Sequence, residues 1–332
     1  MPTKHLILHR MNPDTPSIAI LIPAYNAART IARAAQSALA EAEVGEVIVV
    51  DDASTDTTAD AARAADDGSG RLKLLVQPQN AGPSAARNRA IGESTAPWIG
   101  ILDADDFFLP GRMKRLLSFA NSADLIADDI GQVNEDAIDG PRKSLLGEAL
   151  SAPRQINFAE FVSSNVSDKK RPRGELGFIK PLMRRTFLDT HNLRYQEHMR
   201  LGEDYELYAR ALALGARLYL MPSQGYVSVM RVHSLSGQHA VEDLQHLRDC
   251  DDALSKISGL TLADKTALRQ HYLSVDCRLQ WRRLIDAVKK RDFRAAFTTC
   301  CRPWPVPLYL TSCLMEQAVL RTGKKLKGKT NG

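Results

Sequence analysis

The chain has 332 residues, of which 44% are hydrophobic and 25% are charged, the balance of an ordinary globular protein rather than a disordered one. Its net charge of +5 is uneven, because 13 Lys and Arg face three acids from Arg278 onward and leave the preceding part acidic. No apolar run reaches the roughly 18 residues of a membrane span, no signal peptide fits the N-terminus, and the five cysteines form no CxxC pair. We therefore expect a cytoplasmic protein without a disulfide framework or a zinc site.

The first hundred residues alternate short apolar runs with segments rich in Ala and Arg. The apolar runs have the near-continuous hydrophobicity of strands covered on both faces, and they are residues 17–22, 46–51, 71–76 and 97–103. The intervening segments favour helices, at residues 27–42, 55–65 and 83–93. This alternation predicts an α/β protein with a doubly wound, mostly parallel sheet, in which ligands bind beyond the carboxyl ends of the strands.

The pattern changes along the rest of the chain. Residues 124–173 are mixed and polar, and we expect a variable excursion there, whereas residues 202–214 predict a helix with acids in its first turn. From about residue 240 onward, two apolar stripes at helical spacing follow one another, the second after a capping-box sequence at 261–264. We therefore divide the chain into an N-terminal extension (1–16), an α/β domain (17–238) and a helical, basic C-terminal appendage (239–332).

Polar motifs follow the first two predicted strands. Pro23-Ala24-Tyr25-Asn26 follows the first strand, where the GxGxxG fingerprint of a Rossmann dehydrogenase is absent, and by itself it is also typical of a turn. Asp51 and Asp52 follow the second strand. Helix capping does not account for both, since adjacent carboxylates repel each other. An aspartate in this place can accept a hydrogen bond from the N3–H of a uracil ring.

Three carboxylates follow the fourth predicted strand, in Asp103-Ala104-Asp105-Asp106. This charge density is costly unless a cation neutralises it, and oxygen ligands suit Mg²⁺ or Mn²⁺. The alternative is a solvated acidic turn before Pro110. The buried character of the preceding strand and the acids at the other strand ends favour the metal site.

Taken together, these motifs resemble family 2 glycosyltransferases of the GT-A fold over about residues 17–237. The resemblance rests on motifs in the same order, PAYN at 23–26, DDASTD at 51–56, NAGPSAARN at 80–88, LDADD at 102–106, GED at 202–204 and RVHS at 231–234. Each motif alone is weak, whereas their order and spacing are specific. The general look of the chain is similar to bacterial exopolysaccharide glucosyltransferases of the succinoglycan type.

The resemblance implies a donor site for a UDP-sugar. It assigns Pro23 and Tyr25 to the nucleoside pocket and Asp52 to the uracil. It places Arg87 near the base or the diphosphate, and Asp103 near the ribose and the water shell of the metal.

The resemblance also implies a metal centre and a base. Asp105 is the expected direct ligand of Mn²⁺ or Mg²⁺, and Asp204 is the expected catalytic base. His233 is expected to approach the diphosphate and metal, with a structural histidine as the open alternative.

The implied reaction is a one-step inverting transfer of a sugar, expected to be glucose, in exopolysaccharide biosynthesis. The acceptor is expected to be a hydroxyl of a polyprenyl-diphosphate-linked or oligosaccharide substrate. Processive members of the family carry QxxRW and transmembrane helices, whereas Gln280-Trp281-Arg282-Arg283 has a different order in the predicted appendage. This departure favours single additions.

Other classes of function were weighed against this one. A sugar nucleotidyltransferase would need a Gly-rich phosphate loop after the first strand, and an inactive nucleotide-sugar-binding protein would not need the metal acids together with Asp204. A nucleic-acid-binding protein is disfavoured by the acidic body. The basic tail and the aromatic–proline segment 303–310 instead favour a peripheral position on the anionic inner face of the plasma membrane, with a merely solvated charged face as the alternative.

Overall fold

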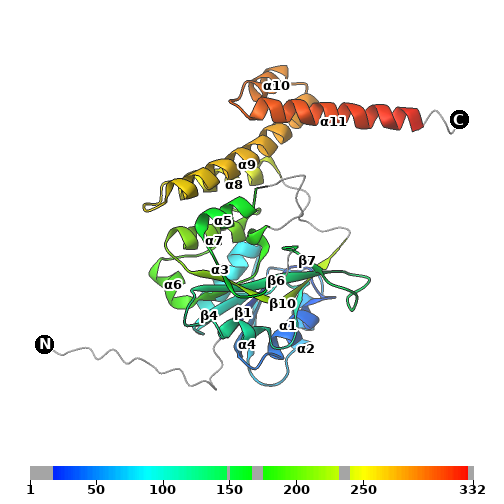
Figure 1. Ribbon diagram of the computed structural model, residues 1–332. Coiled ribbons are helices and arrows are strands. Elements are labelled where there is room, and N and C mark those ends of the chain that lie inside the picture. The colour runs from blue at the N-terminus through cyan, green and yellow to red at the C-terminus, as the bar shows by residue number, and fades with distance from the viewer. Residues whose placement is uncertain (1–17, 148–149, 167–174, 232–239, 328–332) are drawn as a thin grey trace. The chain divides into compact units, whose positions relative to one another are not determined.

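The computed structural model describes residues 18–147, 150–166, 175–231 and 240–327 (Figure 1). The chain forms two compact units and passes between them five times. The first unit comprises Met1–Gln155, Ile179–Glu197 and Ala216–Arg231. The second unit comprises Ile156–Phe178, His198–Gly215 and Val232–Gly332.

A ten-stranded sheet forms the centre of the first unit over the residues that are described. Its longer strands are β1 (Ile18–Ala24), β2 (Val44–Asp51), β3 (Leu72–Val76), β4 (Trp98–Ile101), β6 (Leu125–Asn134) and β10 (Leu218–Met230). The short strands are β5 (Phe107–Phe108), β7 (Lys143–Ser144), β8 (Arg154–Ile156) and β9 (Leu182–Arg184). The four strands predicted in the first hundred residues are therefore present as β1–β4.

The strands follow the order β3-β2-β1-β4-β9-β6-β10-β5. The pairs β3–β2, β2–β1, β1–β4 and β6–β10 are parallel, whereas β9 runs antiparallel to both β4 and β6. Since β9 reverses direction between them, β4 and β6 point the same way. The carboxyl ends of the long strands thus meet along one edge of the sheet, as expected for a mostly parallel α/β protein.

Helices cover both faces of this sheet, α1, α2 and α4 on one face and α3 on the other (Figure 1). They are α1 (Ile31–Leu39), α2 (Thr58–Ala64), α3 (Pro83–Glu93), α4 (Arg112–Leu117) and α6 (Arg185–Thr190). One fully buried apolar cluster joins Ile20 of β1 to Ala35 of α1 and Met113 of α4. Cover on both faces explains why β1 reads as an unbroken apolar run, since all seven residues except Pro23 are buried.

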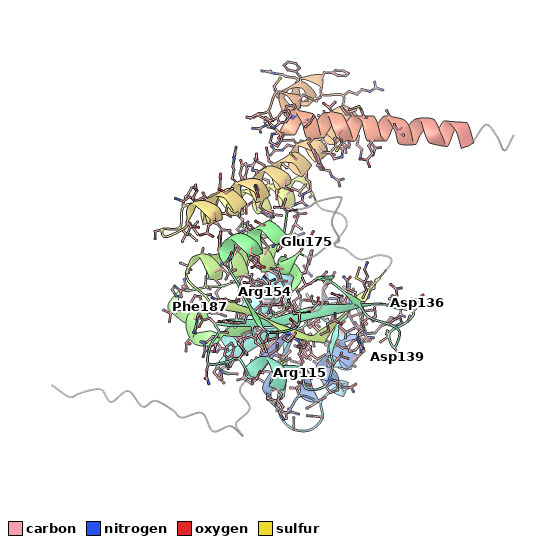
Figure 2. The ribbon with its side chains drawn as sticks, viewed as in Figure 1. Arg115, Asp136, Asp139, Arg154, Glu175 and Phe187 are labelled. Atoms are coloured by element: carbon pink, nitrogen blue, oxygen red, sulfur yellow. The ribbon has the colours of Figure 1, made fainter. Side chains whose placement is uncertain are left out.

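The expectation of a variable excursion over 124–173 is wrong for residues 125–134, which form the buried central strand β6. The two aspartates of this strand, Asp128 and Asp129, make its sequence look like a polar loop. Asp128 is fully buried and accepts a hydrogen bond from Arg112 Nε at 2.9 Å and another from Gly225 N at 2.6 Å. On the same helix as Arg112, Arg115 is exposed at the surface (Figure 2). The sheet therefore contains a buried ion pair where the sequence suggests a polar loop.

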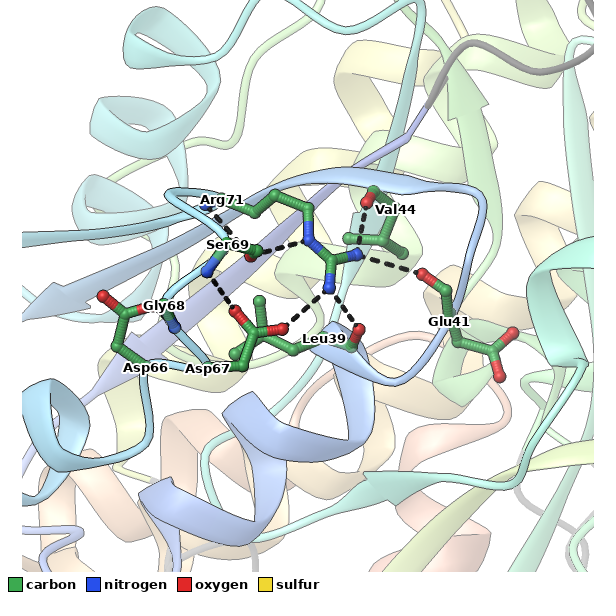
Figure 3. Close-up of polar contacts among 8 residues, drawn as sticks. All are labelled: Leu39, Glu41, Val44, Asp66, Asp67, Gly68, Ser69 and Arg71. Atoms are coloured by element: carbon green, nitrogen blue, oxygen red, sulfur yellow. Dashed lines mark hydrogen bonds and ion pairs between the residues drawn. The ribbon is translucent and has the colours of Figure 1, made fainter.

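Arg71, just before β3, fixes the end of α1 (Figure 3). Its guanidinium donates to the carbonyls of Leu39 at 2.7 Å and Val44 at 3.0 Å, and it pairs with Asp67 at 2.8 Å. The last carbonyls of a helix have no partner within the helix, and a cation is favourable at that end. Arg71 thus satisfies the last of these carbonyls, that of Leu39, and joins α1 to β2 and β3.

The second unit is helical over the residues described. Its elements are α5 (Phe158–Ser164), the 3₁₀ turn η1 (Leu176–Phe178), α7 (Glu203–Ala213), α8 (Val241–Leu254), α9 (Leu262–Lys289), α10 (Phe293–Cys300) and α11 (Val306–Lys327). The predicted helix at 202–214 and the capping box of Thr261 and Asp264 are both present. None of the helices in the described part of the chain combines the length and hydrophobicity needed to cross a bilayer.

A buried polar network joins three helices of this unit. Asp251 of α8 accepts a hydrogen bond from Tyr205 of α7 at 2.9 Å and lies 2.8 Å from Nδ1 of His271 of α9. The rings of Tyr205 and His271 are also in contact, tilted by 35° with centroids 4.5 Å apart. Buried polar groups of this kind must be paired to be tolerated, and here the pairing fixes how the three helices pack.

Candidate active site

The loops that follow β1 and β2 are tied together at the carboxyl edge of the sheet. Asn26 N donates to Ser54 Oγ at 2.9 Å, and Thr55 N donates to Asn26 Oδ1 at 2.9 Å. Asn26 and Ala53 both have a positive φ, of 49° and 57°, a conformation that costs energy for a residue with a side chain. The mutual hydrogen bonds hold this strained pair of loops in one arrangement.

The adjacent carboxylates of Asp51 and Asp52 have separate partners. Asp51 accepts a hydrogen bond from Ser54 N at 3.0 Å, whereas Asp52 accepts from Ala81 N at 2.8 Å and from Gly82 N at 2.7 Å. Both aspartates are buried. Asp52 therefore positions the loop before α3, and its role toward uracil stays a prediction.

Tyr25, expected beside the nucleoside, is half-exposed in the loop after β1. Pro23, at the end of the same strand, is partly buried. Their donor-binding roles stay predictions, as does that of Arg87.

Asp103 forms the most strongly charged contact of the site. It pairs with Arg87 of α3 at 3.2 Å and with Lys180 Nζ at 3.0 Å. Burial alone would raise the pKa of the Asp103 carboxyl, but Lys180 and Arg87 outweigh it and lower the pKa to about 2. The structure thus brings together Arg87 and Asp103, two residues singled out in the sequence. Arg87 also lies over the ring of Tyr195, 5.1 Å from its centroid.

Asp106 points into the protein rather than toward the strand-end surface. Its carboxylate accepts hydrogen bonds from the hydroxyl of Tyr226 at 2.8 Å and from Val229 N at 2.9 Å. Burial, followed by the charges of Asp103 and Asp105, raises the pKa of Asp106 to about 8. Of the three clustered acids, Asp106 is therefore a structural residue that joins the acidic loop to β10.

Asp105 is partly exposed, slightly more so than Asp103, and lacks a close ion-pair partner among the described residues. Its side chain is 38% exposed, and its carboxylate lies 3.6 Å from Arg231, beyond hydrogen-bond distance. Burial and the charge of Asp103 raise its pKa, against the opposing charge of Arg231. A carboxylate held in such surroundings gains from a nearby cation. Within the described ranges, no group of three or more His, Cys, Asp and Glu side chains is arranged to hold a metal ion.

Two cations of this site were missed in the sequence. Lys180 stands alone in the apolar run before β9, and a buried lysine without an acid nearby would be unfavourable, so its position was a usable signal. Arg231 is the first residue of the RVHS motif and directly follows β10. Topology brings both to the strand-end carboxylates, because β9 and β10 lie in the same sheet as β4.

Asp204 belongs to the second unit, where it is buried in the first turn of α7. Gly202 caps this helix with a φ of +74°, and a Cβ on it would lie 2.6 Å from the side chain of Leu247. The backbone conformation and the close packing at position 202 therefore both require glycine, independently of any catalytic role. Arg210 pairs with Glu206, one helical turn earlier, at 2.7 Å. His233 lies outside the described residues, and the roles of Asp204 and His233 stay predictions.

Comparison with known proteins places this geometry in a family. Residues 19–199 match the family described as glycosyl transferase family 2. The chain is 49% identical over 280 residues to "Succinoglycan biosynthesis protein ExoU" of Rhizobium meliloti (strain 1021), covering 84% of this chain and 81% of that protein.

Two solved structures share the fold. S. aureus TarS 1–349 in complex with UDP-GlcNAc has a TM-score of 0.58 at 18% identity, covering 85% of this chain and 90% of that one. The mannosyltransferase PcManGT from Pyrobaculum calidifontis, in complex with GDP-Man and Mn²⁺, has a TM-score of 0.53 at 17% identity, covering 89% and 83%. Given the family match over more than half of the residues and the close relative across most of them, the chain belongs to glycosyl transferase family 2 and is a glycosyltransferase of the GT-A fold.

Proposed function

We propose that this glycosyltransferase is inverting, metal-dependent and non-processive, and that it moves a sugar from a UDP-sugar to a hydroxyl of a lipid-linked or oligosaccharide acceptor. The relative named for succinoglycan biosynthesis supports a place in exopolysaccharide assembly, for which glucose is the expected sugar. The neighbour bound to UDP-GlcNAc and the neighbour bound to GDP-Man and Mn²⁺ support a nucleotide-sugar donor and a divalent cation.

The observation that carries the proposal is that the three clustered acids, Asp103, Asp105 and Asp106, have different partners. Asp103 is neutralised by Lys180 and Arg87, and Asp106 is turned inward onto β10. Asp105 is left at the surface with a raised pKa. One carboxylate, supplemented by substrate phosphates and water, is a donor set that Mg²⁺ and Mn²⁺ accept. The residues present therefore fit the expected metal, with Asp105 as its protein ligand.

The cations around the acids suit a diphosphate. Lys180 and Arg87 flank Asp103, and Arg231 faces Asp105. A nucleotide-sugar brings negative charge to this edge, and further charge develops on the diphosphate as the sugar leaves. Fixed cations there stabilise that charge without reorganising, which is the largest kind of catalytic contribution that a site of this type makes.

The protein's own part in the reaction is to hold the donor and remove one proton. Tyr25 and Asp52 are expected to hold the uridine, and Asp204 to take the proton of the acceptor hydroxyl as it attacks the anomeric carbon. A bound divalent cation supplies positive charge that stabilises the leaving diphosphate. A general base contributes roughly 10²–10⁴ in rate.

A thermal-shift screen tests the donor and the metal together. UDP-, GDP- and ADP-sugars are compared in Mn²⁺ and in EDTA, since a ligand that binds the folded state raises Tm by mass action. We expect a UDP-sugar to stabilise the protein only with Mn²⁺, and Asp105→Ala to remove that effect. Asp136→Ala, in an exposed loop, is the control for a lost carboxylate. Full activity in EDTA would contradict the metal requirement.

A pair of neighbouring variants tests the base. Asp204→Asn should keep UDP-sugar binding and lower kcat at least about 10²-fold, whereas Glu203→Gln, one residue away, should keep most of the activity. If only Glu203→Gln is inactive, the assignment is wrong. If the wild type binds the donor but transfers no sugar to any lipid-linked or oligosaccharide acceptor, it acts as a binding protein.

A further inference from the structure

Exposed apolar side chains concentrate at the end of the second unit. Among the described residues, eight of the thirteen large exposed hydrophobic side chains fall between residues 288 and 319. They are Val288, Phe293, Phe297, Trp304, Leu308, Leu314, Met315 and Val319. Such a concentration in one short part of a chain marks a surface that meets a partner.

The aromatic members lie on and beside α10. Phe293 and Phe297 are one helical turn apart, so they share a face of α10, and they are 81% and 70% exposed. Trp304, in the connection to α11, is 71% exposed. Another side of α10 is packed, since Thr299 is buried and Ala296 contacts a small core formed by α9 and α11. The helix is therefore fixed on that side while the two rings stay exposed.

Exposed cations flank these rings in the sequence. Lys289, Lys290, Arg291, Arg294 and Arg302 are all exposed, and the one acid between residues 289 and 304 is Asp292. The carboxylate of Asp292 is already used, because it caps α10 by accepting a hydrogen bond from Ala295 N at 2.9 Å. Residues 288–304, called the α10 surface below, therefore combine three exposed aromatic rings with a strong positive charge.

We propose that the α10 surface binds an anionic lipid bilayer, with Phe293, Phe297 and Trp304 below the headgroups and the five cations among them. Aromatic rings favour the interface between headgroups and acyl chains, and each Lys or Arg near an anionic leaflet adds to the binding. A second copy of the chain is the less suitable occupant, because it would bring the same cations face to face. Attraction between charges alone would not require three exposed aromatic rings on this surface, whereas insertion below the headgroups uses them.

Vesicle binding tests the proposal with the full chain and needs neither donor nor acceptor, so its outcome is separate from that of the proposed function. Vesicles of phosphatidylcholine with phosphatidylglycerol should sediment the protein, and vesicles of phosphatidylcholine alone should not. Binding should weaken as NaCl is raised, since salt screens surface charges. Equal binding to both vesicles would overturn the electrostatic part, and no binding to either would overturn the proposal.

Matched variants separate the rings from the charges. Changing Phe293, Phe297 and Trp304 to Ser should weaken vesicle binding at least about tenfold. Leu262→Ser, also at a highly exposed position but outside the α10 surface, should have no effect. Wild-type binding by the triple variant would overturn the insertion of the rings. If the triple variant instead dissociates a dimer seen by light scattering, the surface joins two copies and the proposal fails.

The charge test compares equal losses of charge. Changing Lys289, Lys290, Arg291 and Arg294 to Gln should weaken binding roughly 600-fold, since each cation contributes roughly fivefold. The control changes four exposed lysines elsewhere to Gln, Lys114, Lys143, Lys256 and Lys265, and should bind nearly as wild type. Equal losses in both variants would show that net charge matters and the α10 surface does not.

Trp304 provides a native probe of insertion. Of the three tryptophans, Trp98 is buried and Trp281 is partly buried, so a change in emission on adding vesicles should come from Trp304. We expect a blue shift and quenching by lipids brominated in their acyl chains, both absent in Trp304→Phe. Wild-type protein that sediments with vesicles without quenching would be bound by charge alone, contrary to the proposal.

Discussion

The buried ion pair beneath the candidate site gives a sharp prediction about stability. Arg112 is 1% exposed and Asp128 is fully buried, and the pair lies between α4, β6 and β10. The cation also lies 5.0 Å from the ring centroid of Phe108. Replacing Asp128 with Leu leaves the guanidinium buried without its carboxylate and leaves Gly225 N without an acceptor.

The expected loss for Asp128→Leu is about 3–5 kcal/mol, because breaking a buried pair leaves an uncompensated charge. The double variant Arg112→Met/Asp128→Leu removes both charges, so it should lose less than the sum of the two single variants. Urea denaturation of all four proteins gives the coupling energy as a double-mutant cycle. Arg115→Met, at an exposed position on the same helix, should stay within about 0.5 kcal/mol of wild type.

The same pair should influence the donor site. Arg112 also donates to the backbone carbonyl of Lys180 at 2.7 Å, and the side chain of Lys180 pairs with Asp103. The double variant should therefore bind nucleotide more weakly than wild type even where it is fully folded. Additive losses of stability would refute the account of a coupled pair, and unchanged nucleotide affinity would refute its link to the site.

Three further predictions concern single positions. Gly202→Ala should destabilise the protein by about 1–3 kcal/mol in urea denaturation, and by more than Gly68→Ala. Both glycines have a positive φ, but only a Cβ at Gly202 would collide with a neighbouring side chain. Burial raises the pKa of Asp124, but hydrogen bonds from Arg217 outweigh burial and lower the pKa below its ordinary value. The ionised carboxylate therefore stabilises the fold at pH values above the pKa of the unfolded state, and this stabilisation is lost as the pH falls. Asp124→Asn should accordingly lower Tm more at neutral pH than at acid pH. Thr261→Ala removes the cap of α9 and should cost about 1 kcal/mol by denaturation, with UDP-sugar affinity unchanged.

The sequence was sufficient where local pattern and tertiary environment agree. The strands β1, β2 and β4 are short apolar runs that are largely buried, whereas β3 is a partly exposed edge strand. The helix α3 begins and ends at the predicted residues, Pro83 and Glu93. The helix predicted from residue 27 begins only at Ile31, because the preceding turn is held to the start of α2 by a hydrogen bond from Ala27 N to Thr58 Oγ1 at 2.8 Å. A long-range contact of this kind leaves no periodic signal.

The sequence was insufficient where a polar residue is buried by a distant partner. β6 carries two aspartates that a local pattern assigns to a loop, and the partner of Asp128 lies on α4. Likewise, the local sequence does not distinguish the surroundings of the three acids at 103–106. Their different surroundings, Lys180 for Asp103 and Tyr226 for Asp106, come from β9 and β10. The motif therefore predicts a metal site, which stays a prediction, but it does not reveal that Asp106 is turned inward onto β10.

The order of strands in the sheet also has a consequence for the nascent chain. The neighbours of β1 are β2 and β4, so this part can pair once residue 101 has left the ribosome. The outer edge of β4 then stays unpaired until β9 (Leu182–Arg184) has been synthesised, and β6 stays unpaired until both β9 and β10 have been synthesised. Unpaired strand edges attract other chains, and late long-range pairing prolongs their exposure. Substitutions that weaken β9 or β10 should therefore reduce the yield of soluble protein during synthesis more than they reduce the activity of the molecules that fold.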